Sequence, residues 1–495
     1  MKSRRTLSAA IAGLLICSLL SGCSALSAPS KAEVKLENNV LKDAAVTVTD
    51  GTHSGSSYTL TKGSVITADF SQPAEINTII LREKNLKANG FTIEAKQNGE
   101  YQKIYEQDDN IGEYRYCAFP TVKADGLRFT LLGCDGETSL KSFEAYLSPK
   151  RESADFRVTT YITTETAYDK DTLMKQAGSM DVVTDIIFFA PALFNENGDV
   201  WARDMELDGQ QVTGRQIMDT CIQNLKALIG DHKIKIYCNF SGPGAPAGTP
   251  EKDIYKEMNR LHTQAMKDNG ETLINNLIQF TKDYGMEGIF FDYEYPSGFG
   301  NWKAFGDFLA DLKEAAGASC TVGAATPAWK DLLMKKAVKS VDTAEVMSYD
   351  MFDEMGYHSA FAHSAHDVVA DYAALGVPFK NIDLGIPFYA RPTDTGAIWY
   401  DYAQEAEQLG KFHNIGTGSV EAVHWIDGEK VTDTQTTDRY YNSYQMVYDK
   451  TAYAIDLGLG GVMTWHYGTD LPYENELSLF RAIKQAITDR TAEQN

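Results

Sequence analysis

The sequence predicts an α/β protein: a (β/α)8 barrel preceded by an all-β jelly-roll sandwich domain. From residue 155 to about residue 490, eight short β-rich apolar runs alternate with helix-like stretches, which is typical of a parallel sheet buried on both faces. Residues 35–150 contain short alternating runs without helices between them. The chain of 495 residues is also too long for one ordinary domain. An open doubly wound sheet is the alternative to the barrel, but no GxGxxG follows any strand.

The predicted barrel spans residues 155–490. Its eight strand candidates are FRVTTYIT, VTDIIFFAPALF, KIKIYCNF, GMEGIFFDYEYP, CTVGAATPAW, AEVMSYDMFD, NIDLGIPFYARP and LGGVMTWHYG. Eight such units over about 330 residues fit a closed barrel, whose carboxyl-terminal rim carries the chemistry in barrel enzymes. A short insertion is expected at about 392–440.

The amino-terminal β part spans residues 35–150. The order of its runs, from DFSQPAEINTIILRE to SFEAYLS, resembles a discoidin-like (galactose-binding-like) jelly roll. Modules of that kind often bind sugars, but all six Trp of the chain lie outside this segment. A spacer or interaction module is therefore an equal alternative to a lectin. We expect this segment to fold on its own.

The first residues predict export. Residues 1–22 combine a basic start with the apolar run AAIAGLLICSLL, which is too short to span a membrane as a mature helix. The run ends in LSGC, which resembles a bacterial lipobox with lipid carried on Cys23. Residues 23–34 then form a tether. We expect a protein held by lipid on the outer face of the membrane, at the bacterial cell surface; a plain secretory signal is the alternative.

Charge and cysteine content exclude several function classes. A net charge of −22 argues against nucleic-acid binding, which needs a basic face. The five cysteines remaining after Cys23 are an odd number at scattered spacing, so a disulfide framework and a zinc site are not expected, although a Cys117–Cys134 bridge is possible. No metal and no cofactor is predicted. We expect a monomer.

Two carboxylates follow the fourth predicted strand. Alternate residues of a strand share one face, so Phe290, Asp292 and Glu294 point into the barrel, with Glu294 at the mouth. Two carboxyls this close cannot both ionise cheaply, so one pKa should rise, as a general acid requires. An ordinary ion pair at the rim is the alternative.

Other strand ends add aromatic and hydrogen-bonding groups, as a sugar-binding cleft requires. They are Met347, Tyr349 and Asp350 on the sixth strand, Tyr389 and Arg391 on the seventh, and Trp465 on the eighth. His358, His363 and His366 are expected on a loop at the rim, without a common role.

At this point the chain, over residues 155–485, resembles glycoside hydrolase family 18, the TIM-barrel chitinases and endo-β-N-acetylglucosaminidases. EGIFFDYE corresponds to the family's DGxDxDxE, MSYD to its M-x-Y-D, and LGIPFYAR and GGVMTW to its later strand motifs. The resemblance implies that Glu294 donates the proton, that Asp292 and Tyr349 hold the substrate's acetamido group, and that Trp465 lies beneath the reacting sugar. It implies hydrolysis of β-1,4 bonds beside N-acetylglucosamine, assisted by the substrate.

Two departures from the family pattern bear on activity. Phe290 replaces the middle Asp of the signature, and YCNFSG replaces the family's S-x-G-G. Asp292 should therefore either find another partner, for which Tyr161, Asn239 and Tyr349 are the candidates, or work with an altered pKa. The function expected is that of a lipid-anchored glycosidase acting on an N-acetylglucosamine-containing glycan. The alternative is a non-catalytic, chitinase-like lectin.

Overall fold

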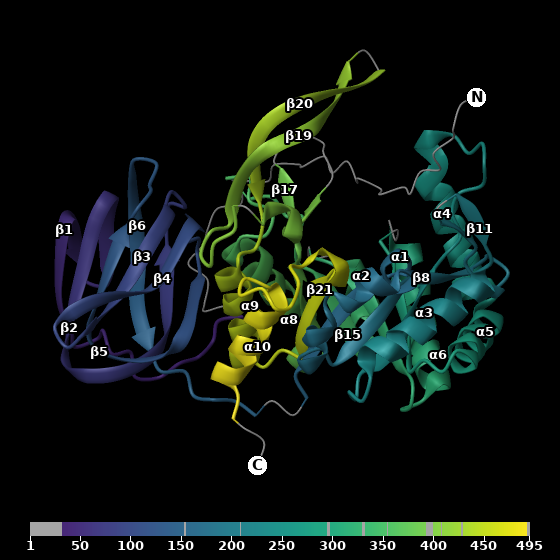
Figure 1. The fold of residues 1–495 in the computed structure, drawn as a ribbon, viewed down its shortest axis with the longest axis horizontal. Coiled ribbons are helices and arrows are strands. Elements are labelled where there is room, and N and C mark those ends of the chain that lie inside the picture. Colours follow the sequence, from purple (N-terminus) through teal and green to yellow (C-terminus); the bar gives the residue numbers. More distant parts are fainter. Residues whose placement is uncertain are drawn as a thin grey trace.

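The computed structural model describes residues 32–492 apart from 153–154, 208, 295–297, 329–331, 354, 393–398, 407 and 427–428, and only the backbone of residues 423–426 and 429–430. The predicted signal peptide, Cys23 and most of the tether lie outside the described residues. Within the described part, no helix is both long enough and apolar enough to cross a membrane. Figure 1 shows an amino-terminal β domain on one side of a helix-covered barrel.

Eight parallel strands form a closed barrel, as predicted. They pair in the order β12-β13-β14-β15-β16-β21-β7-β8, and β8 pairs with β12 to close the ring. Their bounds are β7 (Arg157–Thr163), β8 (Asp185–Phe194), β12 (Lys235–Ser241), β13 (Gly288–Asp292), β14 (Thr321–Pro327), β15 (Thr343–Met347), β16 (Ile382–Pro387) and β21 (Gly461–Trp465). The carboxyl ends of all eight strands therefore meet at one mouth.

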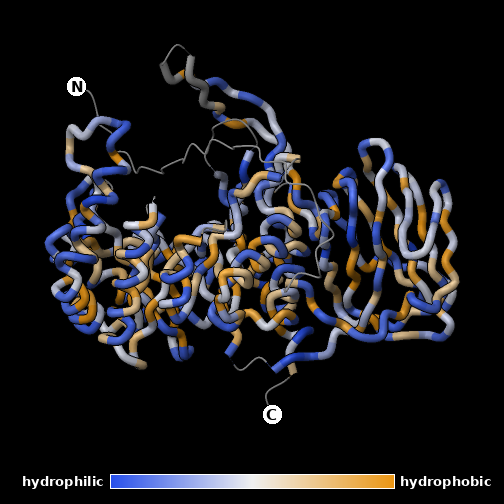
Figure 2. The backbone as a smooth tube through the Cα atoms, turned by 180° about the vertical axis from the view of Figure 1, so that it is seen from behind, coloured by the Kyte–Doolittle hydropathy of each residue, from blue (hydrophilic) through white to orange (hydrophobic). Residues whose placement is uncertain are grey.

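Helices cover the outside of the barrel. They are α1 (Thr164–Tyr168), α2 (Lys170–Met174), α3 (Gly214–Ile229), α4 (Ile254–Thr263), α5 (Gly270–Asp283), α6 (Phe299–Ala316), α7 (Lys335–Lys339), α8 (Asp367–Leu375), α9 (Tyr444–Leu457) and α10 (Leu479–Arg490). Short 3-10 or π turns are η1 (Ala177–Asp181), η2 (Glu251–Asp253), η3 (Gln264–Asp268), η4 (Leu332–Met334), η5 (Ala362–His366), η6 (Phe379–Asn381), η7 (Tyr402–Glu405) and η8 (Tyr467–Thr469). Figure 2 shows hydrophobic and hydrophilic segments alternating along this part of the chain.

Short strands decorate the barrel mouth. β9 (Val200–Ala202) extends the sheet antiparallel to β8, and β10 (Met205–Leu207) pairs with β11 (Gln210–Val212). The insertion predicted at 392–440 forms a sheet of β17 (Tyr389–Pro392), β18 (Tyr400–Asp401), β19 (Ile415–Ile426) and β20 (Glu429–Tyr440). Its long hairpin β19–β20 projects from the barrel in Figure 1.

The amino-terminal domain is all-β. Its six strands are β1 (Ala45–Ser54), β2 (Ser57–Glu83), β3 (Asn89–Gln97), β4 (Glu100–Asn110), β5 (Arg115–Leu131) and β6 (Glu137–Tyr146). The pairing order is β1-β2-β5-β3-β4, with β6 paired to β2. Cys117 and Cys134 are both free thiols, so the possible bridge between them is not present. The two cysteines have different backbone partners in the sheet: Cys117 pairs with Ile79, and Cys134 forms an isolated β-bridge with Ala88.

Helix α9 lies between the barrel and the β domain. Ser443 caps its first turn by accepting a hydrogen bond from the backbone N–H of Met446 at 3.2 Å. The helix ends at Gly458, whose φ of 82° suits glycine. Every residue from Gln445 to Asp456 is buried, on all faces of the helix. A helix buried all round needs partners on both sides, and here these are the barrel and strand β5.

Candidate active site

Alternation along β13 places the two predicted carboxylates inside the barrel. Ile289 and Phe291 pack outward into the large apolar cluster beneath the helices. Phe290 instead packs in a small interior cluster with Tyr161 and Met463. Since successive residues of a strand point to opposite faces, Asp292 and Glu294 follow Phe290 toward the mouth, as predicted.

Asp292 and Glu294 have pKa values displaced in the direction that proton transfer requires. The pKa of Asp292 is raised well above its usual range by burial and by the charge of Glu294. Glu294 is exposed at the barrel mouth. The surrounding walls nevertheless remove part of its water, and this desolvation, together with the charge of Asp350, raises its pKa. A protonated Glu294 open to incoming molecules can act as a general acid.

The expected partners do not bond Oδ1 of Asp292. Among the described residues, this buried oxygen accepts no hydrogen bond. The Tyr161 hydroxyl and the Asn239 side-chain nitrogen are likewise buried without a partner there. Tyr349 is near enough for the charge of Asp292 to raise its pKa, after burial as the larger cause. None of the three candidates therefore bonds Oδ1 within the described part of the chain, and the raised pKa of Asp292 corresponds to the other expectation, an altered pKa. A polar group of a ligand could satisfy this oxygen.

An aromatic stack occupies the layer beneath Asp292. Phe290 is fully buried and lies against Tyr237, with ring centroids 4.7 Å apart and planes inclined by 12°. The Tyr237 hydroxyl donates a hydrogen bond to Asp185. Gly323 on β14 leaves room for this stack, because a Cβ there would lie 2.2 Å from the Phe290 ring. Phe290 thus fills this layer with an apolar ring. A carboxylate at the same position would need a hydrogen-bond or charge partner.

A second group of carboxyls lies on other strands of the barrel. Asp383 accepts hydrogen bonds from Arg157 at 2.5 and 3.0 Å and from Thr159 at 3.3 Å. Glu345 is buried, and burial with the charge of Asp383 raises its pKa well above its usual range. Its strand position is level with that of Asp292, because both residues pair with Ala325 of the intervening β14. The sequence analysis did not single out Glu345. The feature that could have indicated it is a glutamate in the middle of an otherwise apolar strand.

Asp350 anchors a polar cluster beyond the end of β15. Its carboxylate accepts a hydrogen bond from the Tyr389 hydroxyl at 2.9 Å and forms an ion pair with Arg391 at 2.8 Å. Burial opposes its ionisation, but the contacts with His358 and Arg391 outweigh burial and lower the pKa of Asp350 to about 2. Asp350 is therefore a fixed negative charge beside Glu294.

His358 belongs to this cluster and was missed in the sequence. Predicted to lie on a rim loop, it is fully buried and stacks on Tyr389 with ring centroids 5.4 Å apart. Its Nε2 lies 3.1 Å from the carbonyl oxygen of Tyr440, and its Nδ1 accepts from the backbone N–H of Asp350 at 3.4 Å. Burial lowers the pKa of His358, which agrees with a neutral ring in these contacts. No motif signals this residue, because Tyr389 and Tyr440, which surround its ring together with the nearby Asp350, come from distant segments.

Aromatic rings line the other side of the site. Trp465 lies 5.3 Å from Tyr161 and 4.8 Å from Phe189, measured between ring centroids. Trp399 of the insertion lies 5.1 Å from Tyr389 and 6.2 Å from Trp465. Met347 packs against the interior cluster from β15. Such rings provide flat apolar faces of the kind on which sugar rings stack.

The nine barrel residues predicted as site residues thus converge on one mouth from five strands or their ends. They are Tyr161, Asp292, Glu294, Met347, Tyr349, Asp350, Tyr389, Arg391 and Trp465. The arrangement offers one exposed carboxyl with a raised pKa, one buried carboxyl oxygen without a partner among the described residues, one fixed negative charge and a wall of aromatic rings. Together these groups can transfer a proton to an uncharged ligand held against the rings.

Comparisons with known proteins agree with this arrangement. The class V chitinase of Arabidopsis thaliana is 24% identical over 286 residues, which cover 50% of this chain and 72% of that protein. Chitinase 1 of Aphanocladium album is 26% identical over 242 residues, covering 39% of this chain and 55% of that protein. Among solved structures, the group IV chitinase of Ostrinia furnacalis has a similar fold, with a TM-score of 0.51 and 18% identity over 68% of this chain and 100% of that chain.

A family model described as "Glycosyl hydrolases family 18" matches residues 157–470, which include the whole barrel from β7 to β21 and every barrel residue of the site. This match covers more than half of the chain. The chain therefore belongs to glycosyl hydrolase family 18.

Proposed function

We propose that the protein is a glycosidase that cleaves β-1,4 bonds next to N-acetylglucosamine by a retaining mechanism assisted by the substrate. The observation that carries the proposal is the pairing of exposed Glu294 with the half-buried Asp292. Desolvation and the charge of Asp350 favour the protonated form of Glu294 at pH values where a free glutamate is ionised. Asp292 Oδ1 remains available to a ligand.

In the first step, Glu294 gives its proton to the glycosidic oxygen as the bond from that oxygen to C1 breaks. The carbonyl oxygen of the sugar's own 2-acetamido group bonds to C1, and an oxazolinium ion forms. Asp292 accepts a hydrogen bond from the acetamido N–H, which aligns the carbonyl oxygen with C1. The protein therefore needs no nucleophile of its own.

In the second step, water attacks C1 and passes a proton to the Glu294 carboxylate. The bond between C1 and the acetamido oxygen breaks, so the acetamido group and the acid form of Glu294 are both restored. Two displacements at C1 return the original anomeric configuration. Tyr349, whose pKa is raised by burial and by the charges of Asp292 and Glu294, would donate a hydrogen bond from its hydroxyl to the acetamido group.

Trp465 and its neighbours provide the binding surface for the sugar. The apolar face of a pyranose ring can stack on the indole, while Asp350 and Arg391 offer a fixed acceptor and donor to its hydroxyl groups. Related proteins support an acetamido glycan as ligand. The group IV chitinase of Ostrinia furnacalis was solved in complex with allosamidin. The group II chitinase catalytic domain 2 from the same insect, with a TM-score of 0.50 and 17% identity to this chain, was solved with (NAG)5.

One observation favours the alternative of a non-catalytic glycan-binding protein. The layer beneath Asp292 consists of Phe290 and Tyr237 rather than of a hydrogen-bonded carboxylate. A carboxyl without a partner below it is costly to ionise, which would weaken its stabilisation of the oxazolinium. Because Glu294 is retained, we place hydrolysis first.

We further propose that lipid on Cys23 holds the protein at the outer face of a bacterial membrane. The support is the apolar run that ends in LSGC at residues 20–23. The mouth of the barrel would then act on glycans outside the cytoplasm.

A hydrolysis screen tests the proposed activity. Chitin, soluble chitooligosaccharides, the chitobiose core of N-glycans and peptidoglycan each offer an acetamido sugar and should separate the substrate classes. A glucose polymer without acetamido groups serves as the control and should remain intact. Binding of chitooligosaccharides without hydrolysis of any of the four would establish the alternative.

A further inference from the structure

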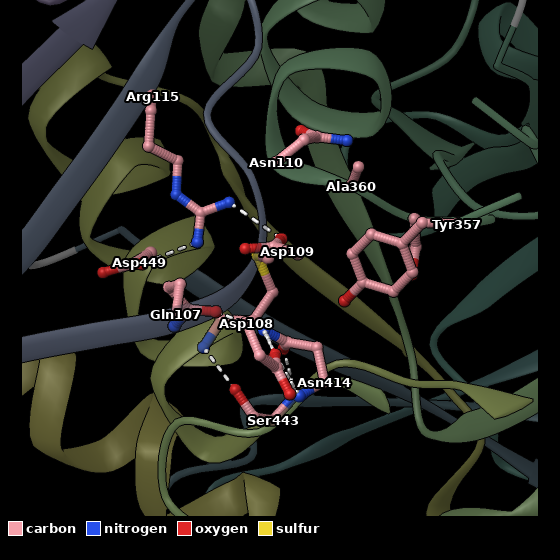
Figure 3. A network of polar contacts seen from close by, with 12 residues as sticks. Gln107, Asp108, Asp109, Asn110, Arg115, Tyr357, Ala360, Asn414, Ser443 and Asp449 are labelled. Carbon is pink, nitrogen blue, oxygen red and sulfur yellow. Dashed lines mark hydrogen bonds and ion pairs between the residues drawn. The ribbon is translucent and has the colours of Figure 1, made fainter. Parts of the chain in front are cut away.

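The interface between the β domain and the barrel contains buried charged side chains. Arg115 of β5 is fully buried and lies 3.1 Å from Asp109 of β4 and 3.8 Å from Asp449 of α9. The Tyr105 hydroxyl donates to Asp449 at 2.5 Å. Figure 3 shows the Arg115 guanidinium between the two carboxylates. Burying charges requires partners in defined geometry, so this interface holds the two parts in one arrangement.

One end of this interface reaches the residues behind the active site. The described residues 350–353 and 355–358, which follow β15 and begin with Asp350 and end with His358, are called the 350–358 loop below. Asp353 within this loop accepts hydrogen bonds at Oδ1 from the backbone N–H groups of Met355 and Tyr357, at 2.9 and 2.8 Å. The other carboxylate oxygen of Asp353 accepts a hydrogen bond from Asn110, at the end of β4. The β domain therefore contacts the residue that shapes the loop.

The 350–358 loop also contacts the polar cluster of Asp350 at the site. The backbone N–H of Met351 donates to the carbonyl of His358 at 3.0 Å, which closes the loop on itself. The Tyr357 hydroxyl donates to the carbonyl of Tyr441 at 2.7 Å. His358 accepts from the backbone of Asp350 and stacks on Tyr389, as described above. Asn110 is therefore connected to the polar cluster of Asp350 through contacts of the 350–358 loop.

A second contact joins β4 to the base of the insertion. Asp108 of β4 accepts from the backbone N–H of Asn414 at 2.8 Å, and the Asn414 side chain donates to Gln107. Asn414 in turn accepts from Ser443, the cap of α9, at 3.0 Å. Figure 3 shows Asp108, Asn414 and Ser443 close together beneath the end of β4. The carboxyl end of β4 therefore touches both the 350–358 loop and the base of the insertion.

We propose that the β domain is a positioning element for glycan binding, and that Asn110 is the residue through which it acts. By holding Asp353, Asn110 keeps the 350–358 loop in the conformation that presents Asp350 at the barrel mouth. The proposal rests on the proposed function for the identity of the ligand, an acetamido glycan. This positioning role can be separated from a purely structural role of the interface, because the far end of the interface has its own hydrogen bond. There, Ser148 donates to Asp456 at 2.8 Å, near the other end of α9.

An exchange of the two polar side chains tests the proposal. Asn110→Asp places two carboxylates in contact and should release the loop. The double variant Asn110→Asp with Asp353→Asn restores the hydrogen bond with donor and acceptor exchanged. The amide oxygen that Asp353→Asn introduces can still accept from the backbone of Met355 and Tyr357. Ser148→Ala is the matched control, since it removes an interface hydrogen bond at the far end.

Three readouts follow each variant: KM and kcat on a soluble chitooligosaccharide, the Kd of chitopentaose by calorimetry, and amide hydrogen exchange of residues 351–358. Asn110→Asp should raise KM and Kd by about three- to tenfold, with kcat changed less than about twofold, and should speed exchange of the loop. The double variant should restore all three values, and Ser148→Ala should leave them unchanged. If Asn110→Asp does not fold, Asn110→Ala gives a milder release of the same contact.

Three results would each overturn the proposal. Faster exchange with unchanged KM and Kd would show that Asn110 holds the loop without consequence for the ligand. Unchanged exchange, or a double variant as impaired as Asn110→Asp alone, would show that the pair does not hold the loop. Failure of the proposed activity is distinguishable, since the parent protein would then hydrolyse no acetamido glycan while calorimetry and exchange still report on Asn110.

Discussion

Phe290 stacks on Tyr237 in the centre of the barrel, with ring centroids 4.7 Å apart. This contact replaces a polar layer with an apolar one directly beneath Asp292. Gly323 accommodates the Phe290 ring, and a Cβ at Gly288 would lie 2.4 Å from the ring of Tyr237. The two glycines therefore leave the space that the aromatic pair occupies. Phe290 fits the packing of this barrel interior.

Phe290→Asp should destabilise the protein without increasing its activity. The change removes the stack and buries a carboxyl without an evident partner, at a cost of roughly 1–3 kcal/mol or more. Thermal denaturation measures this cost, and initial rates measure the activity. Phe290→Leu is the control, because it keeps the layer apolar. A stable Phe290→Asp variant with much higher kcat would mean that the native site is impaired by Phe290.

Glu294→Gln should lower kcat by about 10²–10⁴-fold with little change in KM, because the amide keeps the shape but has no proton to transfer. Initial rates on chitooligosaccharides measure the loss. Glu287→Gln is a matched control on the same segment, since Glu287 accepts a backbone hydrogen bond from Ile236 at 2.9 Å, away from the mouth. A Glu294→Gln variant with near-normal kcat would exclude Glu294 as the acid.

The fixed charge of Asp350 should affect the pH above which activity is lost, because it contributes, after desolvation, to the raised pKa of Glu294. Glu294 must be protonated to act, so kcat/KM should fall as the pH rises through its raised pKa. Asp350→Asn removes a negative charge that contributes to this raised value. The alkaline limb of the pH profile should therefore move to lower pH, whatever happens to the maximal rate. An unmoved limb would mean that another group titrates there.

The buried interface should make stability depend on pH. Burial outweighs the attraction of Arg115 and raises the pKa of Asp109 to about 6 and that of Asp449 to about 7. The folded state thus binds more protons than the unfolded chain between about pH 4 and pH 7. The contribution of these groups to the free energy of unfolding should accordingly decrease as the pH rises through that range.

Denaturant unfolding at a series of pH values measures this slope. Asp449→Asn should flatten it, because the amide neither gains nor loses a proton. A parent protein and an Asp449→Asn variant with the same slope would show that Asp449 does not titrate in this range.

Cys23→Ala should prevent lipid attachment, so the protein should leave the membrane fraction or remain unprocessed. Fractionation followed by mass analysis of the amino terminus distinguishes these outcomes. Cys17→Ala, within the same apolar run, is the control and should behave like the parent. Unchanged membrane association and processing of Cys23→Ala would contradict the proposed lipid anchor.

The sequence by itself determined the barrel and the position of the Asp292–Glu294 carboxyl pair. Strand alternation is a local property with a period of two residues, so the spacing of Asp292 and Glu294 was enough to place them on one face. Eight apolar runs separated by helical stretches were enough to predict the closed parallel sheet, because each run must be covered on both sides. The predicted site residues from β7 to β21 indeed meet at one mouth.

Only the tertiary structure decided which groups surround those carboxylates. His358 pairs with Asp350 and Tyr440, Phe290 with Tyr237, and Asn110 with Asp353, across separations of up to 243 residues. Partners that distant carry no local signal. Whether Asp292 has a replacement partner or an altered pKa was likewise decided by folding: within the described part of the chain its Oδ1 has no partner, and its pKa is raised. A pKa depends on desolvation and on charges brought together by folding. The sequence could therefore indicate that one carboxyl of the pair has a raised pKa. The folded barrel determined which neighbouring charges and how much burial act on each carboxyl.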